Sequence, residues 1–89
     1  MMIPCYIINL KSRYDRRVNI EKEFTNRQEF AVSVVAAREN NIGCIGLWET
    51  IKQIIYKADN NNQEHILICE DDHQFTADYN FQVLQECIQ

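Results

Sequence analysis

Three short apolar runs, separated by segments with helical spacing, constrain the fold of this chain more than any other feature. The runs are residues 3–10, 30–37 and 66–69. Between the second and third runs, apolar side chains recur at the intervals of an amphipathic helix: Leu47, Trp48, Ile51, Ile54, Ile55 and Ala58. Strands that alternate with helices pair in parallel through right-handed crossovers. The sequence therefore predicts one α/β domain over residues 1–89, with the order β-α-β-α-β-α.

Helices are expected in three places. The first covers residues 14 to about 28, the second begins near Leu47 after a loop at residues 38–43, and the third is capped by Thr76. We place Trp48 in the core, on the apolar face of the second helix. Helices on both faces of a mostly parallel sheet predict a three-layer, Rossmann-like α/β sandwich.

The small number of strands has two consequences. If residues 3–10 form the central strand, that strand and residues 66–69 flank the switch point, where open α/β sheets bind their ligands. Three strands also make a thin sheet, so an unpaired edge is exposed. We therefore expect self-association through a sheet edge.

The composition argues against several classes of function. A formal net charge of −4 disfavours nucleic-acid binding, which needs a basic surface. No apolar stretch is long enough to cross a bilayer, and the N-terminus lacks the pattern of a signal peptide. The four cysteines form no Cys-x-x-Cys pair, so we expect reduced thiols in a cytoplasmic protein and no zinc site. With glycine only at Gly43 and Gly46, a Walker A loop and a G-x-G-x-x-G turn are both excluded.

Three consecutive acids follow the third apolar run directly: Glu70, Asp71 and Asp72. Carboxylates crowded at the end of a buried strand repel one another, and a cation often compensates for such a cluster. Hard oxygen ligands favour Mg²⁺, Mn²⁺ or Ca²⁺. The strand end is therefore a candidate metal site.

A basic segment follows the first strand. Its cations are Lys11, Arg13, Arg16 and Arg17. In the predicted topology this segment lies beside the acidic strand end, which suits a diphosphate held by arginines and by a metal on the carboxylates. The same groups can instead form surface ion pairs with each other. The residues alone leave both interpretations open.

Three motifs occur in order along the chain. They are Ile8-Asn9-Leu10-Lys11 with Arg13 and Asp15-Arg16-Arg17, then Gly43-Cys44 with Trp48, and finally Leu67-Ile68-Cys69-Glu70-Asp71-Asp72. In these motifs the chain resembles the family 25 glycosyltransferases, which transfer sugars to lipopolysaccharide and procollagen. The acidic motif is similar to the metal-binding Leu-Glu-Asp-Asp signature of that family's GT-A fold. Two features depart from the pattern: Tyr14 stands where the family commonly has proline, and the family's Ser-His is missing before Trp48.

The resemblance implies a GT-A-like fold that binds a nucleotide-diphospho-sugar and passes the sugar to a saccharide acceptor, as in lipopolysaccharide or surface-glycan synthesis. By this resemblance Glu70 and Asp72 hold Mn²⁺ or Mg²⁺ against the donor diphosphate, and the metal acts as a Lewis acid. It also implies a set of residues that bind the nucleotide-sugar: Asn9, Leu10, Arg13, Arg17 and Asp71.

The resemblance covers the N-terminal, donor-binding half of such an enzyme. The family's acceptor site and catalytic base lie in a later part, so we expect the 89 residues alone not to turn over. One alternative is a remnant that binds a nucleotide or nucleotide-sugar without catalysis. Another is a structural interaction domain in which the acids and arginines only pair.

Overall fold

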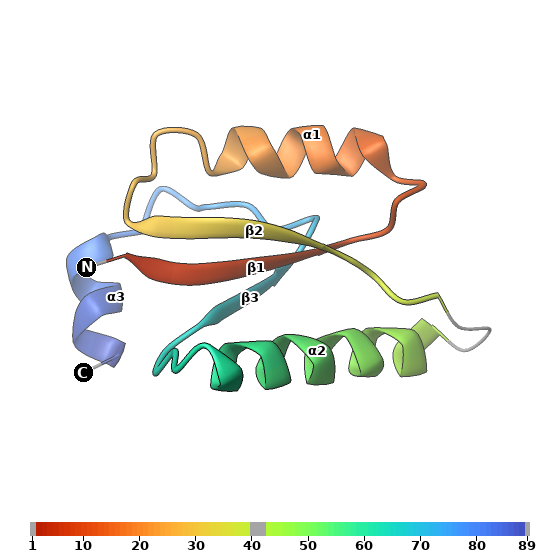
Figure 1. Cartoon of the computed structure of the whole chain (residues 1–89). Helices are drawn as coiled ribbons and strands as arrows, with labels where there is room; N and C mark the ends of the chain where they lie inside the picture. Colours follow the sequence, from red (N-terminus) through yellow and green to blue (C-terminus); the bar gives the residue numbers. More distant parts are fainter. Residues whose placement is uncertain (1, 40–42, 89) are drawn as a thin grey trace.

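The computed structural model describes residues 2–39 and 43–88. Three strands form one parallel sheet in the order β2-β1-β3. The elements are β1 (Ile3–Asn9), α1 (Tyr14–Glu23), β2 (Phe30–Ala36), α2 (Gly43–Asn60), β3 (Leu67–Glu70) and α3 (Phe81–Ile88). The predicted α/β class and element order are confirmed, and the first strand is the central one. Figure 1 shows α1 and α2 on opposite faces of the sheet.

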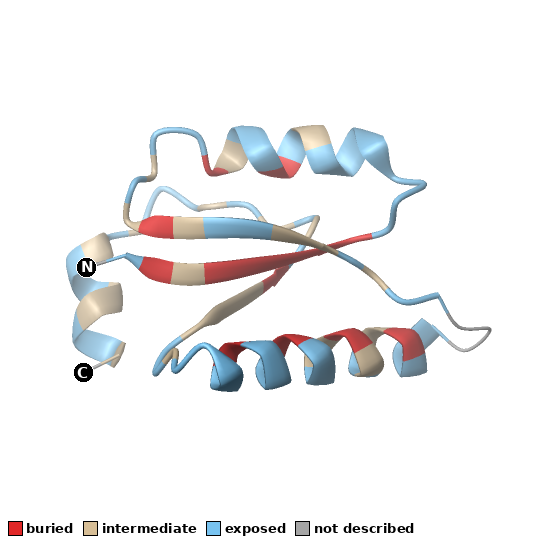
Figure 2. Cartoon of the chain, viewed as in Figure 1, coloured by how far each residue is buried: buried red, intermediate tan, exposed pale blue. Residues whose placement is uncertain are grey.

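Strand β1 lies at the centre of the sheet and is the most buried of the three strands. Every residue from Ile3 to Asn9 is buried except Pro4, which is half-buried (Figure 2). Its neighbours are in register with Ile3 opposite Phe30 of β2 and with Cys5 opposite Leu67 of β3. A strand covered on both faces must be apolar on both faces, and this explains its continuous hydrophobic sequence.

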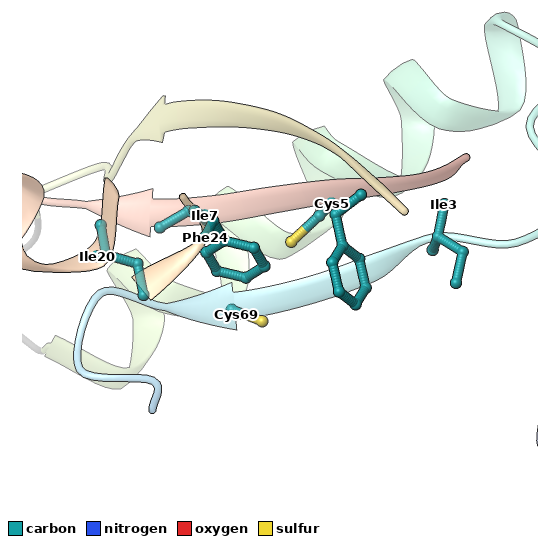
Figure 3. Close-up of a cluster of buried hydrophobic side chains, with 7 residues drawn as sticks. Ile3, Cys5, Ile7, Ile20, Phe24 and Cys69 are labelled. Atoms are coloured by element: carbon teal, nitrogen blue, oxygen red, sulfur yellow. The ribbon is translucent and has the colours of Figure 1, made fainter. Parts of the chain in front are cut away.

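Side chains of β1 divide between two cores because successive residues of a strand point to opposite faces. The core on the α1 side contains Ile3, Cys5, Ile7, Ile20, Phe24, Phe30 and Cys69 (Figure 3). The core on the α2 side is built around Tyr6, Ile8 and Ile54. The phenol of Tyr6 also donates a hydrogen bond of 2.6 Å to Gln63 Oε1.

Four cysteines occur as free thiols in two environments. Cys5 and Cys69 are buried in the core on the α1 side, and the hydrogen bond with Cys69, together with burial, raises the pKa of the Cys5 thiol. Cys44 and Cys87 are exposed on α2 and α3.

Helix α1 ends at Glu23, five residues before the position expected from the sequence. Asn26 adopts the left-handed conformation, with φ of 64°, which a continuing helix does not allow. Phe24 is the C-cap, and its ring packs edge-on against Phe30, with 5.5 Å between the ring centroids. The helix therefore stops where its last aromatic side chain enters the core.

The expected cap of the third helix was wrong. Helix α3 is capped by Asn80 rather than by Thr76, because Asn80 Oδ1 accepts hydrogen bonds from the backbone of Gln82 (2.8 Å) and Val83 (3.4 Å). The expected loop at residues 38–43 lies partly outside the described residues, and Gly43 already belongs to α2.

Trp48 is not in the core, since 56% of it is exposed. The buried stripe of α2 consists of Gly46, Thr50, Ile54 and Ala58. Residues four apart share a helix face, and Trp48 lies two residues from Gly46 and from Thr50, on the opposite side. Small residues in this stripe allow α2 to pack close to the sheet, and the tryptophan faces outward.

Candidate functional site

The carboxyl ends of β1 and β3 meet at a buried amide. Asn9, the last residue of β1, is only 4% exposed. Its Nδ2 donates to Asp71 Oδ2 at 2.9 Å and to the backbone carbonyl of Arg13 at 3.1 Å. The Asn9 side chain therefore connects the turn after β1 to the turn after β3, across the predicted switch point.

Asp71 is held from a second direction. Arg16 Nη1 lies 3.3 Å from Asp71 Oδ1, and the Asp71 side chain is 10% exposed. Both carboxylate oxygens therefore have a partner, one a neutral amide and the other a guanidinium. Arg16 belongs to the basic segment recognised in the sequence, but neither spacing nor resemblance gave it this position.

The other two arginines of the basic segment pair with acids close to them in the sequence. Nε and Nη2 of Arg13 each donate to one oxygen of Asp15 at 3.0 Å, and this hydrogen-bonded pair lowers the pKa of Asp15 to about 2. Arg17 lies 3.2 Å from Glu21, one helical turn away. Both pairs are exposed to solvent, so they contribute little to stability, and each arginine can exchange its partner for another anion.

The acidic triplet forms a tight turn that divides its members between the two faces of the sheet. The backbone N–H of His73 donates to the carbonyl of Glu70 at 3.1 Å, with Asp71 and Asp72 at the corners. Glu70 follows the alternation of Ile66 and Ile68, which face α2. Asp71 follows Cys69 and faces α1.

Each side of this end of the sheet carries a groove. The groove on the α2 side has a volume of about 740 Å³, and its lining includes Ile8, Leu10, Arg38, Cys44, Leu47 and Glu70. The groove on the α1 side has a volume of about 510 Å³, and its lining includes Arg13, Arg16, Lys22, Asp71, Asp72 and His73. The structure thus brings Asn9, Arg13 and Asp71 together, places Leu10 with Glu70 on the other side, and leaves Arg17 in neither lining.

The segment after the acidic turn packs firmly on the end of α1. Glu23 Oε1 accepts the backbone N–H of Phe75 at 2.6 Å, and the guanidinium of Arg27 stacks 3.8 Å from the centroid of the Phe75 ring. Tyr79 donates its hydroxyl hydrogen to Glu29 Oε2 at 2.6 Å. Burial and this hydrogen bond raise the pKa of Tyr79 to about 12, and the same bond lowers the pKa of Glu29.

His73 lies inside this packing rather than in a free strand-end position. Its ring centroid is 4.7 Å from that of Phe75 and 5.8 Å from that of Phe24. Its buried Nε2 has no hydrogen-bond partner among the described residues. The ring therefore contributes mainly aromatic packing beneath the groove on the α1 side.

The donor set has the chemistry for a hard cation but does not form a closed cage. Within residues 2–39 and 43–88, no three His, Cys, Asp or Glu side chains converge as metal ligands. Glu70 and Asp72 are exposed and belong to different groove linings. Mg²⁺ is often bound by one or two carboxylates together with phosphate oxygens of a substrate, and this open arrangement fits that mode better than a site made of protein ligands alone.

No family model, curated protein or solved structure is significantly similar to this chain. None of the helices in the described part of the chain combines the length and apolar character that a bilayer crossing needs.

Proposed function

We propose that this chain is the donor-binding portion of a metal-dependent glycosyltransferase with a GT-A-like, Rossmann-type arrangement. Its ligand would be a nucleoside diphospho-sugar bound at the carboxyl ends of β1 and β3. One observation carries the proposal: Asn9 and Arg16 both bind Asp71, so a basic turn and an acidic turn are fixed side by side. The order of sequence motifs supports the same assignment.

The nucleotide would contact residues on both sides of the acidic turn. Arg13 and Arg16 line the groove on the α1 side and can exchange their present carboxylate partners for phosphate oxygens. Leu10 contributes apolar surface to the groove on the α2 side. Asp71 stays oriented by Asn9 when Arg16 turns to phosphate, as a residue that contacts a donor ribose or sugar must be.

Glu70 and Asp72 are the proposed metal ligands. In the described residues neither side chain forms an ion pair, so both remain available to a cation. A bound Mn²⁺ or Mg²⁺ would neutralise charge on the departing nucleoside diphosphate. Oxygens of the diphosphate would complete the coordination shell.

A specific observation favours a second function, that of a structural interaction domain. Arg13 and Arg17 are paired with acids two and four residues further along the chain, as expected if the charged residues serve only solubility and interaction. A module that binds a nucleotide without catalysis is intermediate between the donor-binding portion of an enzyme and a structural interaction domain.

Calorimetric titration with UDP and other nucleoside diphosphates, each with and without Mn²⁺, tests the proposal. Metal-dependent heat would support it, and no heat with any nucleoside diphosphate would exclude both enzyme and binding module. Binding without sugar transfer or donor hydrolysis would favour the binding module. Asp72→Asn should abolish metal-dependent binding and leave the fold intact.

Asp59→Asn is the matched control, because Asp59 is an exposed acid at the far end of α2. It should bind as the wild type does. If Asp72→Asn instead unfolds the chain, Asp72 is a structural acid and its assignment as a metal ligand is wrong.

A further inference from the structure

The outer edge of β2 is the longest unpaired strand edge in the described chain. β2 has seven residues, Phe30–Ala36, whereas β3, at the other edge of the sheet, has four. In Figure 1 β2 lies at the front of the sheet, with no described segment beyond it. Edge strands are normally protected by charges, proline or a bulge, and the sequence of β2 contains no charged residue and no proline.

The hydrogen bonds of β2 identify the groups that remain free. Ile3 N–H donates to the carbonyl of Glu29 at 2.8 Å, and Ala37 N–H donates to the carbonyl of Asn9 at 2.9 Å. The backbone groups of odd-numbered residues in β2 therefore form hydrogen bonds with β1. Alternate residues of a strand point their backbone groups in opposite directions, so the even-numbered residues direct theirs to the free edge.

Three residues carry this free edge: Val32, Val34 and Ala36. The N–H of Phe30, the other even-numbered residue, is already donated to the carbonyl of Arg27 at 3.2 Å. Val32 and Ala36 are also exposed, with 39% of Val32 accessible, which is unusual for valine in a strand. The edge therefore has backbone groups without a partner in the sheet, and its side chains are apolar.

We propose that β2 pairs in antiparallel fashion with β2 of a second copy of this chain. The three free residues are symmetric about Val34, so a twofold axis there places Val34 opposite its own equivalent and Val32 opposite Ala36 of the other copy. Such an arrangement satisfies the free N–H and C=O groups with about six backbone hydrogen bonds. It doubles the three-stranded sheet and closes as a dimer. The pairing does not depend on the proposed function.

The composition of β2 allows a second copy to pair with this edge. In an isologous contact each residue lies opposite a residue of the same strand, so like charges in that strand would repel each other. All opposed side chains in the register centred on Val34 are small or β-branched and uncharged, so no like charges oppose each other within the strand.

Sedimentation velocity over a concentration series tests the proposal with a matched pair of variants. Val32→Lys adds a charge at an exposed position of the edge and should weaken dimerisation by roughly tenfold or more. Val83→Lys makes the same change at a residue of α3 that is 57% exposed, and it should leave the dimer unchanged. Thermal melting of both variants checks that each is folded.

Ala36→Pro provides a second test that acts on the backbone. It removes an N–H that points away from β1, so the internal ladder is kept while one intermolecular bond on each side is lost. The wild type should dimerise, and Ala36→Pro should shift the monomer–dimer equilibrium toward the monomer.

A wild type that stays monomeric up to roughly 0.5 mM, where a micromolar dimer would be saturated, overturns the proposal. Equal effects of Val32→Lys and Val83→Lys overturn it as well. Growth into oligomers larger than a dimer would show open-ended pairing and would exclude the twofold arrangement.

Discussion

At the carboxyl ends of β1 and β3, neighbouring carboxylates have different environments on the two sides of the sheet. On the α1 side, Asp71 is 10% exposed and has Asn9 and Arg16 as partners for its two oxygens. On the α2 side, the adjacent Glu70 is exposed and lines an open groove, with no ion-pair partner among the described residues. The difference arises because consecutive residues at a strand end point to opposite faces.

The comparison separates a structural acid from an available one. Asp71 exchanges its hydration for a fixed amide and guanidinium, so removing its partners leaves a poorly solvated charge. Glu70 keeps its hydration and can accept a ligand without first breaking a bond. A run of acids in a sequence is therefore not necessarily a cluster in space, and each member needs its own test.

Among the residues of the candidate site, the largest effect is expected from Asn9→Leu. The substitution removes the donor to Asp71 and leaves the carbonyl of Arg13 without its amide partner, which should lower the free energy of unfolding by about 2 kcal/mol. Glu70→Leu is the control on the other side and should change the same quantity by no more than about 0.5 kcal/mol. Urea denaturation measures both, and equal losses would contradict the division into structural and available acids.

Asp71→Asn should have a smaller effect. The amide can still accept from Asn9, but its charge interaction with Arg16 is lost, so we expect a destabilisation of about 1 kcal/mol. Raising the salt concentration should reduce the difference between wild type and variant, because Arg16 is partly exposed. A difference independent of salt would mean that the Arg16 contact contributes nothing.

The packing behind the α1 side should fail at high pH. Tyr79 has a folded-state pKa of about 12 against an ordinary value of 10.0, so the folded chain retains this proton where the unfolded chain releases it. The stabilisation is complete below pH 10 and is lost as the pH rises toward 12. Chemical denaturation at several alkaline pH values should show this loss, and Tyr79→Phe should remove this part of the pH dependence.

The smallest effect is expected on the outer surface of α2. Trp48→Ala removes a side chain of which 56% is already exposed, so the free energy of unfolding should fall by less than about 1 kcal/mol. Ile54→Ala, at a residue 2% exposed on the inner face of the same helix, should cost about 2–5 kcal/mol. Similar losses for both would place Trp48 in the core after all.

Local patterns were sufficient for the elements and their order. The continuous apolar run of residues 3–9 indicated a buried strand, and the structure has this strand at the centre of the parallel sheet. The inward face of α2 was harder to predict from the sequence. Apolar spacing favours Trp48 as a buried residue, but the buried stripe contains Gly46 and Thr50 instead. Thr50 is buried because its hydroxyl donates to the carbonyl of Gly46 and accepts the N–H of Arg38.

The site was only partly accessible from the sequence. Because side chains alternate along a strand, Glu70 and Asp71 are expected on opposite sides of the sheet, although they are neighbours in the acidic motif. The contact between Asn9 and Asp71 joins residues 62 positions apart and depends on the register of β1 and β3. Helix ends depended on single asparagines, Asn26 in the left-handed conformation after α1 and Asn80 as the side-chain cap of α3, and the spacing of apolar residues does not reveal such positions.

The placement of the four thiols gives this protein an internal reporter of its own opening. Cys44 and Cys87 are exposed and should react with a thiol reagent at once, whereas Cys5 and Cys69 lie in the buried core between β1, β3 and α1. A reagent can reach the second pair only when these strands separate, so their labelling rate follows the cooperative opening of the sheet. Counting modified thiols against time therefore measures how often the central strand is exposed, without any introduced probe.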